Sequence, residues 1–530
     1  MSESDVLIIG AGIAGMVSAY ECLEKGLRVT VVERDSRERV GGLARWAFGG
    51  MAIVDTPLQQ RMKIQDSPEI AWRDWQNFAE YEANTHWEQA WGKYYVEHSR
   101  EAVYDYLYQK GLRFFPAVNW VERGLYGEGN SLPRYHVLWG TGQRLVDRFS
   151  ELLRPYEQNG KLTLLFDTRC ESLICQQDRV CGAVTVSEEN GATQELKAAH
   201  TIVATGGING SLQKVRHAWG DAPEELLNGA HPFADGHLHD VVEALGGKVT
   251  HLQNMWNYAA GIPHPKPHFD GHGLSLIPCK SALWLDHEGK RIGPEPLVTG
   301  FDTHELCRRV ALLERPYTWQ VLNWKIAAKE LAVSGSEHNP SIRDRKLFSF
   351  LKEVLLGNHR LIKQLQHESD HFIVADNPAQ LAQKMNALQG DDAVNEQTLH
   401  ATITAYDRMI QRGESLWNDD QLRRIQHARN WRSDKLRTCK PEPMLKAGNG
   451  PLIAIKLRVI TRKSLGGIQT NLSSAVLDKQ ERAIPGLYAV GEAAGFGGGG
   501  ASGKRSLEGT FLSGCIITAQ AAAKAVSHNS

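Results

Sequence analysis

Hydrophobic residues near the start of the chain follow two different spacings. Residues 6–9 form a short apolar run that predicts a buried strand, residues 13–25 carry apolar side chains at helical spacing, and residues 27–32 form a second run rich in β-branched residues. Glycines separate the first run from the helical segment. The pattern therefore predicts a strand, a glycine turn, a helix and a second strand, in that order.

The glycine turn has the spacing G-x-G-x-x-G. Gly10 suits a tight turn, Gly12 lets the backbone approach a pyrophosphate, and Gly15 permits close packing of the helix on the strand. The N-terminus of a helix favours the negative charge of phosphates. Glu33 follows Gly15 by 18 residues, where an acidic side chain binds the ribose hydroxyls of an adenine dinucleotide. We interpret the segment as a nucleotide site; the alternative is a glycine turn that serves packing alone.

The rest of the chain alternates between strand patterns and helical patterns. Residues 67–110 predict two or three amphipathic helices with aromatic packing, residues 162–186 an antiparallel meander, and residues 201–207 a buried strand closed by glycines. A proline-rich loop and helical segments at 341–366 and 395–412 interrupt this pattern, and strands return after them.

This alternation predicts an α/β protein. The change of pattern sets off residues 251–454, of α+β type, as a separate cap or substrate domain, with strand patterns in the flanking stretches 1–250 and 455–530. The length of 530 residues agrees with more than one domain.

Composition excludes several classes of protein. Hydrophobic residues make up 42% of the chain and charged residues 23%, values typical of a globular protein. Lys and Arg number 60 against 61 Asp and Glu, so charge gives no case for binding nucleic acid or an acidic membrane surface. The segment closest to a membrane span, 511–526, is interrupted by polar residues. The acidic start leaves no room for a signal peptide and the cysteines form no C-x-x-C pair, so we expect a cytoplasmic protein.

Two polar clusters could carry chemistry. Arg134 and His136 lie two residues apart before a Gly-Thr-Gly turn, so in a strand their side chains share a face and form either a site or a paired surface. His264, His268 and His272 have a spacing that suits a metal, but no Cys, Asp or Glu completes a convincing ligand set. We interpret them as solvated loop histidines and predict no metal.

Three widely separated segments resemble one family of flavoproteins. They are GAGIAG with Glu33, TIVATGG at 201–207, and IPGLYAVGEAAG at 484–495. They resemble the FAD-dependent dehydrogenases that include fumarate reductase flavoproteins and 3-ketosteroid dehydrogenases. The overall sequence pattern is most similar to that of the ketosteroid-dehydrogenase-like members. The resemblance extends in order over nearly the whole chain. It implies a Rossmann-like FAD-binding domain made from two segments, with a cap domain for the substrate inserted between them.

The resemblance also implies a place for each part of FAD. The adenine would lie near Glu33 and Cys170, the pyrophosphate over the glycine turn, the ribityl chain near Glu492, and the flavin ring near 41–44 and Ser506. The residues expected to bind FAD are Gly10, Gly12, Ala14, Gly15, Glu33, Arg34, Gly41, Gly42, Leu43, Ala44, Cys170, Ala204, Thr205, Gly206, Gly491, Glu492, Ser506 and Leu507. Some relatives attach flavin through a histidine in the segment that matches 41–50. This segment contains none, so we expect non-covalent FAD.

The chain departs from both groups of relatives at positions that bind substrate. Fumarate reductases have a catalytic arginine near the place of Thr299, and histidines where this chain has Lys463 and Met255. A small dicarboxylate needs several cations or donors, so fumarate and succinate are disfavoured. Ketosteroid enzymes carry a tyrosine in the late glycine-rich loop, which this chain lacks; Arg505 and backbone amides near Gly503 could polarise a substrate oxygen instead.

The favoured hypothesis is flavin-linked desaturation beside a ketone, with hydride transfer from carbon to flavin N5. The candidate bases are Tyr317, Tyr258 and His136, and Arg134 or Arg505 could lower the pKa of a tyrosine. The substrate would be a small apolar ketone, and electrons would pass to a diffusible acceptor or a quinone, because no Fe–S or haem motif is present. One alternative is a reductase of enones or fumarate-like double bonds. Another is a binding protein that keeps the nucleotide fold without redox chemistry.

Overall fold

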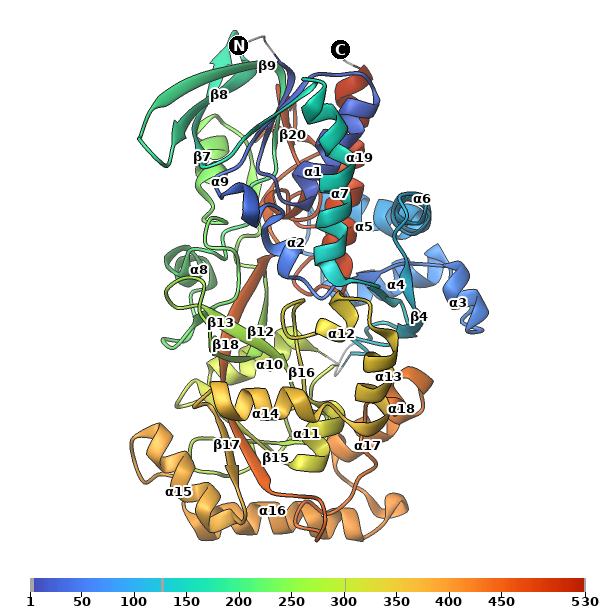
Figure 1. Ribbon diagram of the computed structural model, residues 1–530, viewed down its shortest axis with the longest axis vertical. Helices are drawn as coiled ribbons and strands as arrows, with labels where there is room; N and C mark the ends of the chain where they lie inside the picture. The colour runs from blue at the N-terminus through green and yellow to red at the C-terminus, as the bar shows by residue number, and fades with distance from the viewer. Residues whose placement is uncertain (1–3, 125–127, 301, 529–530) are drawn as a thin grey trace. The chain divides into compact units, whose positions relative to one another are not determined.

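The computed structural model describes residues 4–124, 128–300 and 302–528 (Figure 1). Interactions within the chain divide it into two compact units. Unit 1 comprises Met1–Gly220, Ala230–Trp256 and Arg462–Ser530, and unit 2 comprises Asp221–Gly229 and Asn257–Thr461. The domain limits expected from the sequence, at 250 and 454, stay a prediction.

Unit 1 is built on an eight-stranded sheet with a parallel centre. Its strands are β1 (Ser4–Ile9), β2 (Val29–Val32), β6 (Leu162–Leu165), β7 (Thr168–Gln176), β8 (Arg179–Ser187), β9 (Thr193–Val203), β20 (Ala475–Leu477) and β21 (Ala483–Ala489). The order is β20-β21-β9-β1-β2-β6, and β8 pairs with both β7 and β9. All neighbours from β21 to β6 are parallel. The first and last parts of the chain thus share one sheet, as the sequence predicts.

Helices cover one face of this sheet. α1 (Ile13–Glu24) packs against β1 and β2, and two long helices, α7 (Thr141–Gln158) and α19 (Thr510–His528), pack beside it (Figure 1). On the other face, alternate residues of β1 join a hydrophobic cluster with β7, β8 and α9 (His237–Ala244). Because successive side chains of a strand point to opposite faces, β1 is buried on both sides.

A smaller sheet of order β3-β5-β4 and a group of helices complete the N-terminal part of unit 1. These elements are β3 (Gly50–Ala52), β4 (Phe114–Asn119), β5 (Tyr135–Leu138), α2 (Gly42–Trp46), α3 (Pro57–Arg61), α4 (Pro68–Ala79), α5 (His86–Ser99) and α6 (Tyr106–Gln109). Later in the chain, unit 1 adds α8 (Leu212–Trp219) and the antiparallel pair of β11 (Val249–Thr250) and β19 (Gly467–Ile468). Trp75, Trp91 and Tyr95 are buried, as predicted for the aromatic residues of 67–110, whereas Tyr108 is 53% exposed.

The meander predicted for 162–186 begins later than expected. β6 pairs in parallel with β2, so it belongs to the main sheet. Only β7 and β8 form the antiparallel pair that continues into β9. A short apolar run carries no signal of the direction in which it pairs, and the sequence therefore could not separate β6 from the meander.

Unit 2 contains a second eight-stranded sheet, of order β14-β15-β18-β12-β13-β16, in which β10 and β17 also pair with β18. Its strands are β10 (Leu227–Asn228), β12 (Met255–Pro263), β13 (Gly273–Ile277), β14 (Leu283–Leu285), β15 (Tyr317–Asn323), β16 (Ala332–Val333), β17 (Phe372–Ala375) and β18 (Leu452–Ser464). β15 and β17 are antiparallel to β18, so this sheet has the character of an α+β domain.

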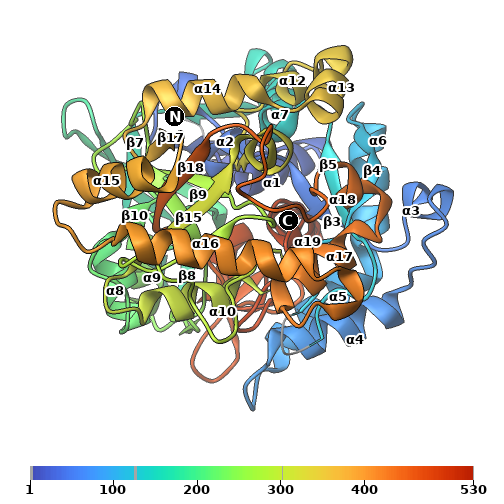
Figure 2. The same ribbon diagram turned by 90° about the horizontal axis from the view of Figure 1, so that it is seen from below.

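Helices enclose the central strands of unit 2. Figures 1 and 2 show α14 (His359–Glu368) on one side of β15, β17 and β18, and α16 (Glu396–Gln411) on the other. Residues of α15 (Pro378–Gln389), α16 and α17 (Asp420–Arg429) form the core with these strands. The other helices are α10 (Thr303–Ala311), α11 (Trp324–Glu330), α12 (Pro340–Arg343), α13 (Leu347–Leu356) and α18 (Arg432–Leu436). The helices predicted within 341–366 and 395–412 are confirmed. In the described residues, no helix has the length and apolar character that crossing a bilayer requires.

Candidate cofactor and active site

The glycine turn after β1 has the close approaches that its spacing predicts. Gly10 has φ +104°, and a Cβ there would lie 2.5 Å from the carbonyl oxygen of Ala204. A Cβ on Gly15 would lie 1.9 Å from the oxygen of Gly10, whereas one on Gly12 would meet no atom within 4 Å. Gly12 is the N-cap of α1 and makes no side-chain cap bond. The helix N-terminus therefore opens onto space that suits a pyrophosphate.

Glu33 is fixed at the end of β2, beside the glycine turn. Its carboxylate accepts the N–H of Ala11 at 2.6 Å and the N–H of Asp35 at 2.8 Å. The next residue, Arg34, forms ion pairs with two carboxylates from other parts of unit 1. Glu33 thus has the position of a ribose-binding carboxylate, while Arg34 ties neighbouring loops together.

The segment 41–44 lies against the glycine turn. The N–H of Gly41 donates to the carbonyl oxygen of Ala11 at 3.1 Å, and Gly41 forms an isolated β-bridge with Gly12. Gly41 and Gly42 both have positive φ, 108° and 52°. The second of them begins the short helix α2, which contains the rest of the segment. Two segments that the sequence assigns to the cofactor are therefore neighbours in space.

The carboxyl ends of β9 and β21 bring in the next group of expected residues. The N–H of Ala204 donates to the oxygen of the last residue of β1 at 2.8 Å. Thr205 and Gly206 continue the chain from there. Gly491 has φ +62°, and a Cβ there would lie 2.8 Å from the Cβ of Ala14. β1, β9 and β21 thus end at the edge of the sheet that carries the glycine turn, which is where open α/β sheets bind ligands.

Cys170, Ser506 and Leu507 are also buried in unit 1. Cys170 of β7 belongs to the hydrophobic cluster that includes the ends of β1 and β2. The Oγ of Ser506 lies 2.8 Å from Oγ1 of Thr510, at the start of α19. All residues that we expect to bind FAD belong to unit 1, and their individual contacts with the cofactor stay predictions.

Lys463 and Glu492 are two half-buried charged groups that influence each other. The Oε1 of Glu492 accepts the N–H of Ser464 at 2.9 Å. Burial raises the pKa of Glu492 to about 7 and lowers the pKa of Lys463 to about 8. The Nζ of Lys463 lies 4.3 Å from the ring centroid of Phe511. Perturbed groups of this kind are candidates for function, and the sequence shows Lys463 only as a departure from a histidine, because burial is not visible in a sequence.

His136 is enclosed in the smaller sheet of unit 1. Its Nε2 lies 2.8 Å from Oγ1 of Thr56, and its Nδ1 lies 2.7 Å from the carbonyl oxygen of Arg134. The residue is 0% exposed, and burial lowers its pKa to about 4. Both ring nitrogens therefore have partners inside the protein, which weighs against His136 as the catalytic base.

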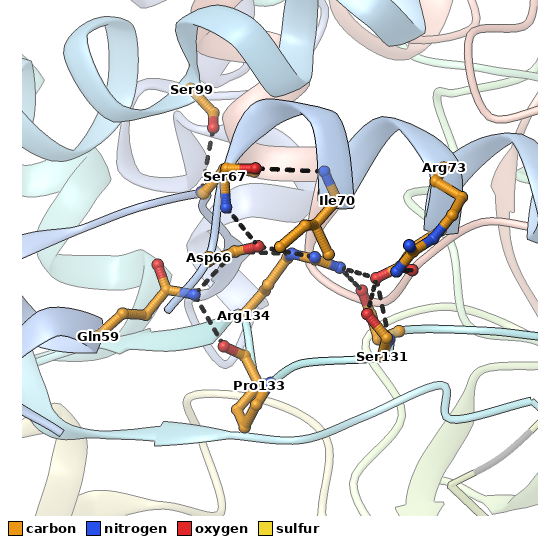
Figure 3. Close-up of polar contacts among 12 residues, drawn as sticks. Gln59, Asp66, Ser67, Ile70, Arg73, Ser99, Ser131, Pro133 and Arg134 are labelled. Atoms are coloured by element: carbon orange, nitrogen blue, oxygen red, sulfur yellow. Dashed lines mark hydrogen bonds and ion pairs between the residues drawn. The ribbon is translucent and has the colours of Figure 1, made fainter. Parts of the chain in front are cut away.

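Arg134 lies at the centre of a buried polar network (Figure 3). Its guanidinium donates to both oxygens of Asp66, at 2.8 Å each, and to Asp74 at 2.6 Å. The side chain of Arg134 is 3% exposed. Gln59 donates to Asp66 and to the carbonyl oxygen of Pro133. The two carboxylates account for the charge of this arginine, which weighs against its use as a cation beside a catalytic tyrosine.

The remaining catalytic candidates are divided between the units. Tyr317 of unit 2 is 4% exposed, its hydroxyl donates to Oε1 of Gln389 at 2.8 Å, and burial raises its pKa. Tyr258 is half-buried in β12. Arg505 of unit 1 forms an ion pair with Glu80, and burial lowers its pKa. The catalytic roles of these residues stay predictions.

The loop histidines of unit 2 are less solvated than the sequence suggests. His264 is 8% exposed, and an acidic residue that the sequence reasoning did not connect with it, Glu337, lies 3.8 Å from its Nε2. His338 is also buried at this place. The interpretation as solvated histidines is therefore wrong for His264. The partners lie far along the chain, so no spacing rule could reveal them.

The parallel sheet and its glycine turn define a dinucleotide-binding protein of the α/β class. A family model described as FAD binding domain matches residues 5–512. The KsdD-like steroid dehydrogenase MT0809 of Mycobacterium tuberculosis (strain CDC 1551 / Oshkosh) is 38% identical over 546 aligned residues, which cover 98% of this chain and 95% of the relative. The chain therefore belongs to the FAD-binding-domain family and is an FAD-dependent oxidoreductase that acts on CH–CH groups.

Two solved structures share the fold over nearly the whole chain. The 3-ketosteroid Δ1-dehydrogenase from Sterolibacterium denitrificans has a TM-score of 0.73 at 16% identity and covers 100% of both chains. The open conformation of a flavocytochrome c3 fumarate reductase has a TM-score of 0.70 at 17% identity and covers 99% of this chain and 78% of its own. These likenesses confirm the predicted architecture of an FAD-binding domain with a cap.

Proposed function

We propose that this oxidoreductase is a ketosteroid-type dehydrogenase, which removes two hydrogens from adjacent carbons beside a ketone. The observation that carries the proposal is the 38% identity, over 98% of the chain, to a protein named KsdD-like steroid dehydrogenase. The similarity includes residues of unit 2 as well as those of the FAD-binding unit. It therefore supports a common type of substrate as well as a common cofactor.

FAD would lie along the edge formed by the glycine turn and the ends of β2, β9 and β21. The open space at Gly12 fits the pyrophosphate, Glu33 fits the ribose, and 41–44 together with Ser506 and Leu507 fit the flavin ring. When bound, FAD accepts the hydride that leaves the substrate. The segment 41–50 has no histidine, which supports non-covalent attachment.

We assign Lys463 the role of holding the negative charge that develops on the substrate oxygen. With a pKa of about 8, its amine is mostly protonated at neutral pH. A half-buried ammonium interacts with an oxyanion more strongly than an ammonium in water does. Arg505 is a second candidate donor in unit 1, but its pairing with Glu80 makes it less available.

Tyr258 is the favoured base that takes the proton next to the ketone. Tyr317 has its hydroxyl bonded to Gln389 and belongs to the hydrophobic core of unit 2, so its removal from that core would be costly. Tyr258 is only half-buried, on strand β12. The deprotonated form of a tyrosine requires a nearby cation, since its ordinary pKa is about 10.

The substrate class follows from the groups that a dicarboxylate would need. Met255 is 7% exposed and Thr299 is neutral, so neither supplies the positive charge that fumarate reductases have at the corresponding places. An uncharged ketone with an apolar body needs only one polarised oxygen. The electrons would leave to a diffusible acceptor or a quinone.

Anaerobic titration of the purified protein with saturated 3-ketosteroids, and in parallel with simple cyclic ketones, tests the proposal. Bleaching of the visible flavin band by a saturated 3-ketosteroid supports the dehydrogenase and its substrate class. Reoxidation of dithionite-reduced protein by an enone, with no bleaching by any saturated ketone, would show a reductase instead. A protein that binds FAD but responds to neither kind of compound would contradict the proposed substrate class.

A further inference from the structure

Four imidazoles and one carboxylate converge within unit 2. His264, His268 and His272 lie on the turn between β12 and β13, and Glu337 and His338 lie between β16 and α12. Potential ligand atoms of the three turn histidines lie within 4.8 Å of one another, and so do those of His264, Glu337 and His338. His264 belongs to both groups.

The carboxylate of Glu337 lies between two imidazoles. Its Oε2 is 3.8 Å from Nε2 of His264 and 3.5 Å from Nε2 of His268. The ring of His264 stacks on that of His272, with centroids 4.4 Å apart, and its centroid lies 5.8 Å from that of His338. Nitrogen and oxygen ligands of zinc lie about 2.0–2.2 Å from the ion. Small movements of the side chains would therefore bring these atoms around one ion.

The ring of His338 indicates, independently of these distances, that a ligand is missing at this place. It is 6% exposed, and neither of its ring nitrogens has a hydrogen-bond partner among the described residues. Buried polar groups in native proteins are nearly always bonded, since an unsatisfied group loses its hydration without compensation. A metal ion at this place would satisfy the ring that the protein leaves without a partner.

We propose that His264, Glu337 and His338 bind a divalent transition-metal ion of the zinc type, with His268 as the fourth ligand. Imidazole nitrogen and carboxylate oxygen are ordinary zinc ligands, and four of them make the closed tetrahedral set of a structural site. The ion would tie the β12–β13 turn to the segment before α12, both within unit 2. Because it would bind the folded chain only, it would stabilise this unit.

Binding requires one local change at His264. Its Nδ1 accepts the N–H of Lys266 at 3.0 Å, so the neutral ring carries its proton on Nε2. A histidine that ligates through one nitrogen carries its proton on the other. When an ion binds at Nε2, the hydrogen bond from the N–H of Lys266 must therefore break, or the imidazole ring must flip.

The test is the zinc content of FAD-loaded, tag-free protein. The protein is treated with a chelator, incubated with Zn²⁺, freed from excess by gel filtration and measured by mass spectrometry of the metal. His264→Ala/His338→Ala removes two ligands, and His367→Ala/His400→Ala removes two exposed histidines as the matched control. We expect one zinc per chain in the wild type and the control, a rise in their melting temperature with zinc, and neither in the ligand variant.

If the double variant does not fold, the variant Glu337→Gln tests the proposed metal site instead. The side chain of Glu337 is 48% exposed, so its loss should leave the fold intact. We expect its zinc affinity to fall by more than the roughly tenfold that loss of an outer partner costs. A wild-type protein that retains no zinc, or a ligand variant that retains as much as the control, would overturn the proposal.

A second inference rests on a separate feature, the exposed apolar helix α13. None of its residues is buried, although most are hydrophobic. Phe348, Leu351 and Leu355 share one face of the helix at helical spacing and are 86%, 41% and 71% exposed. An exposed apolar patch of this kind marks a surface that contacts another protein or a membrane.

The segment of the sequence that contains this helix has an excess of basic residues. Residues 341–367 contain six Lys and Arg against two acidic residues, in a chain whose net charge is −1. Among them Arg345, Lys352 and Lys363 are exposed. An amphipathic helix with a basic border is complementary to a bilayer that contains anionic lipid. We infer that α13 docks onto an anionic membrane surface.

Sedimentation with vesicles tests this second inference. We expect the protein to bind vesicles of phosphatidylcholine with phosphatidylglycerol, to bind phosphatidylcholine alone weakly, and to lose binding in Phe348→Asp/Leu355→Asp. The control Leu312→Asp/Leu416→Asp places the same charge at leucines that are 62% and 61% exposed elsewhere, and should still bind. Absence of binding to any vesicle, or a dimer in analytical ultracentrifugation that the α13 variant dissociates, would overturn the inference, the latter because the occupant would be a second copy.

Discussion

The carboxylate of Glu33 accepts the backbone N–H of Ala11 at 2.6 Å, inside the glycine turn. The end of β2 and the turn that follows β1 are thereby joined by a charge-assisted bond, in addition to the backbone bond from the N–H of Gly10 to the oxygen of Val32 at 2.7 Å. The same carboxylate that would bind ribose thus also shapes the turn that would hold the pyrophosphate. Changes at either residue should affect both parts of the cofactor site.

Glu33→Ala should weaken the binding of FAD. A hydrogen bond to a charged group contributes about 1.5–3 kcal/mol, which corresponds to roughly a tenfold to hundredfold change in the dissociation constant. Titration of the apoprotein with FAD, followed by flavin fluorescence, measures the effect. Glu38→Ala changes an exposed glutamate nearby and should bind FAD like the wild type. Equal affinity in both variants would remove Glu33 from the cofactor site.

Gly12→Ala and Gly15→Ala should fail for different reasons. A Cβ on Gly15 would lie 1.9 Å from the oxygen of Gly10, so this variant should be unstable even without cofactor. A Cβ on Gly12 would meet no protein atom, so that variant should melt like the wild-type apoprotein but bind FAD poorly. Melting curves of the apoproteins and FAD titrations distinguish the two. Normal FAD binding by Gly12→Ala would place the pyrophosphate elsewhere.

Asp74→Ala should destabilise unit 1. It leaves Arg134 with one buried carboxylate fewer, and breaking a buried ion pair costs about 3–5 kcal/mol. The control is Glu97→Ala, which breaks a pair with Lys93 whose side chains are 43% and 58% exposed, and should cost less than about 1 kcal/mol. Urea unfolding gives both values. A stable Asp74→Ala enzyme with reduced kcat would instead return Arg134 to the catalytic candidates.

Lys463 should give activity and stability opposite dependences on pH. Burial lowers its pKa from 10.5 to about 8, repulsion by Arg462 contributes, and Glu492 and Glu508 oppose the shift. Above pH 8 the folded protein loses the ammonium that would hold the substrate oxygen, so kcat should fall. Between about 8 and 10.5 the unfolded chain binds more protons at this group than the folded chain, so its contribution to stability rises with pH.

The variants Lys463→Met and Lys456→Met separate this effect from others. The pKa of Lys456 in unit 2 is also lowered by burial, but we assign it no role in the reaction. Profiles of kcat against pH should lose their alkaline limb in Lys463→Met, together with most of the activity, and keep it in Lys456→Met. An unchanged profile in Lys463→Met would exclude it as the group that titrates.

The cofactor edge could be predicted because its signals are local in the sequence. Gly10, Gly12 and Gly15 fall within one turn, and Glu33 follows after one helix and one strand. The constraint at these positions is a positive φ or a close backbone approach. Glycine is the residue type that tolerates both, so the sequence itself shows where the constraint acts. The same reasoning recognised the strand that ends at Val203, before the glycines at 206 and 207.

The polar clusters could not be predicted because their partners are distant. Arg134 lies 68 residues from Asp66 and 60 from Asp74, so its burial and pairing are properties of the fold alone. His264 and Glu337 likewise lie far apart in the sequence and meet only in the folded structure. A sequence shows the type of a side chain but not the charge opposite it, so it left two alternatives open for Arg134 and His136 and gave the wrong burial for His264.

The pairing of β21 with β9 has a consequence for how the protein is made. Residues 257–461 are synthesised before β21 and α19. Until then, residues 201–203 of β9 lack the strand with which they pair, and α1 lacks the helix α19 against which it packs. An unpaired edge strand in a nascent chain is a site of wrong association, which chaperones shield. A chain cut before residue 483 would therefore lack β21 and expose the unpaired edge of β9.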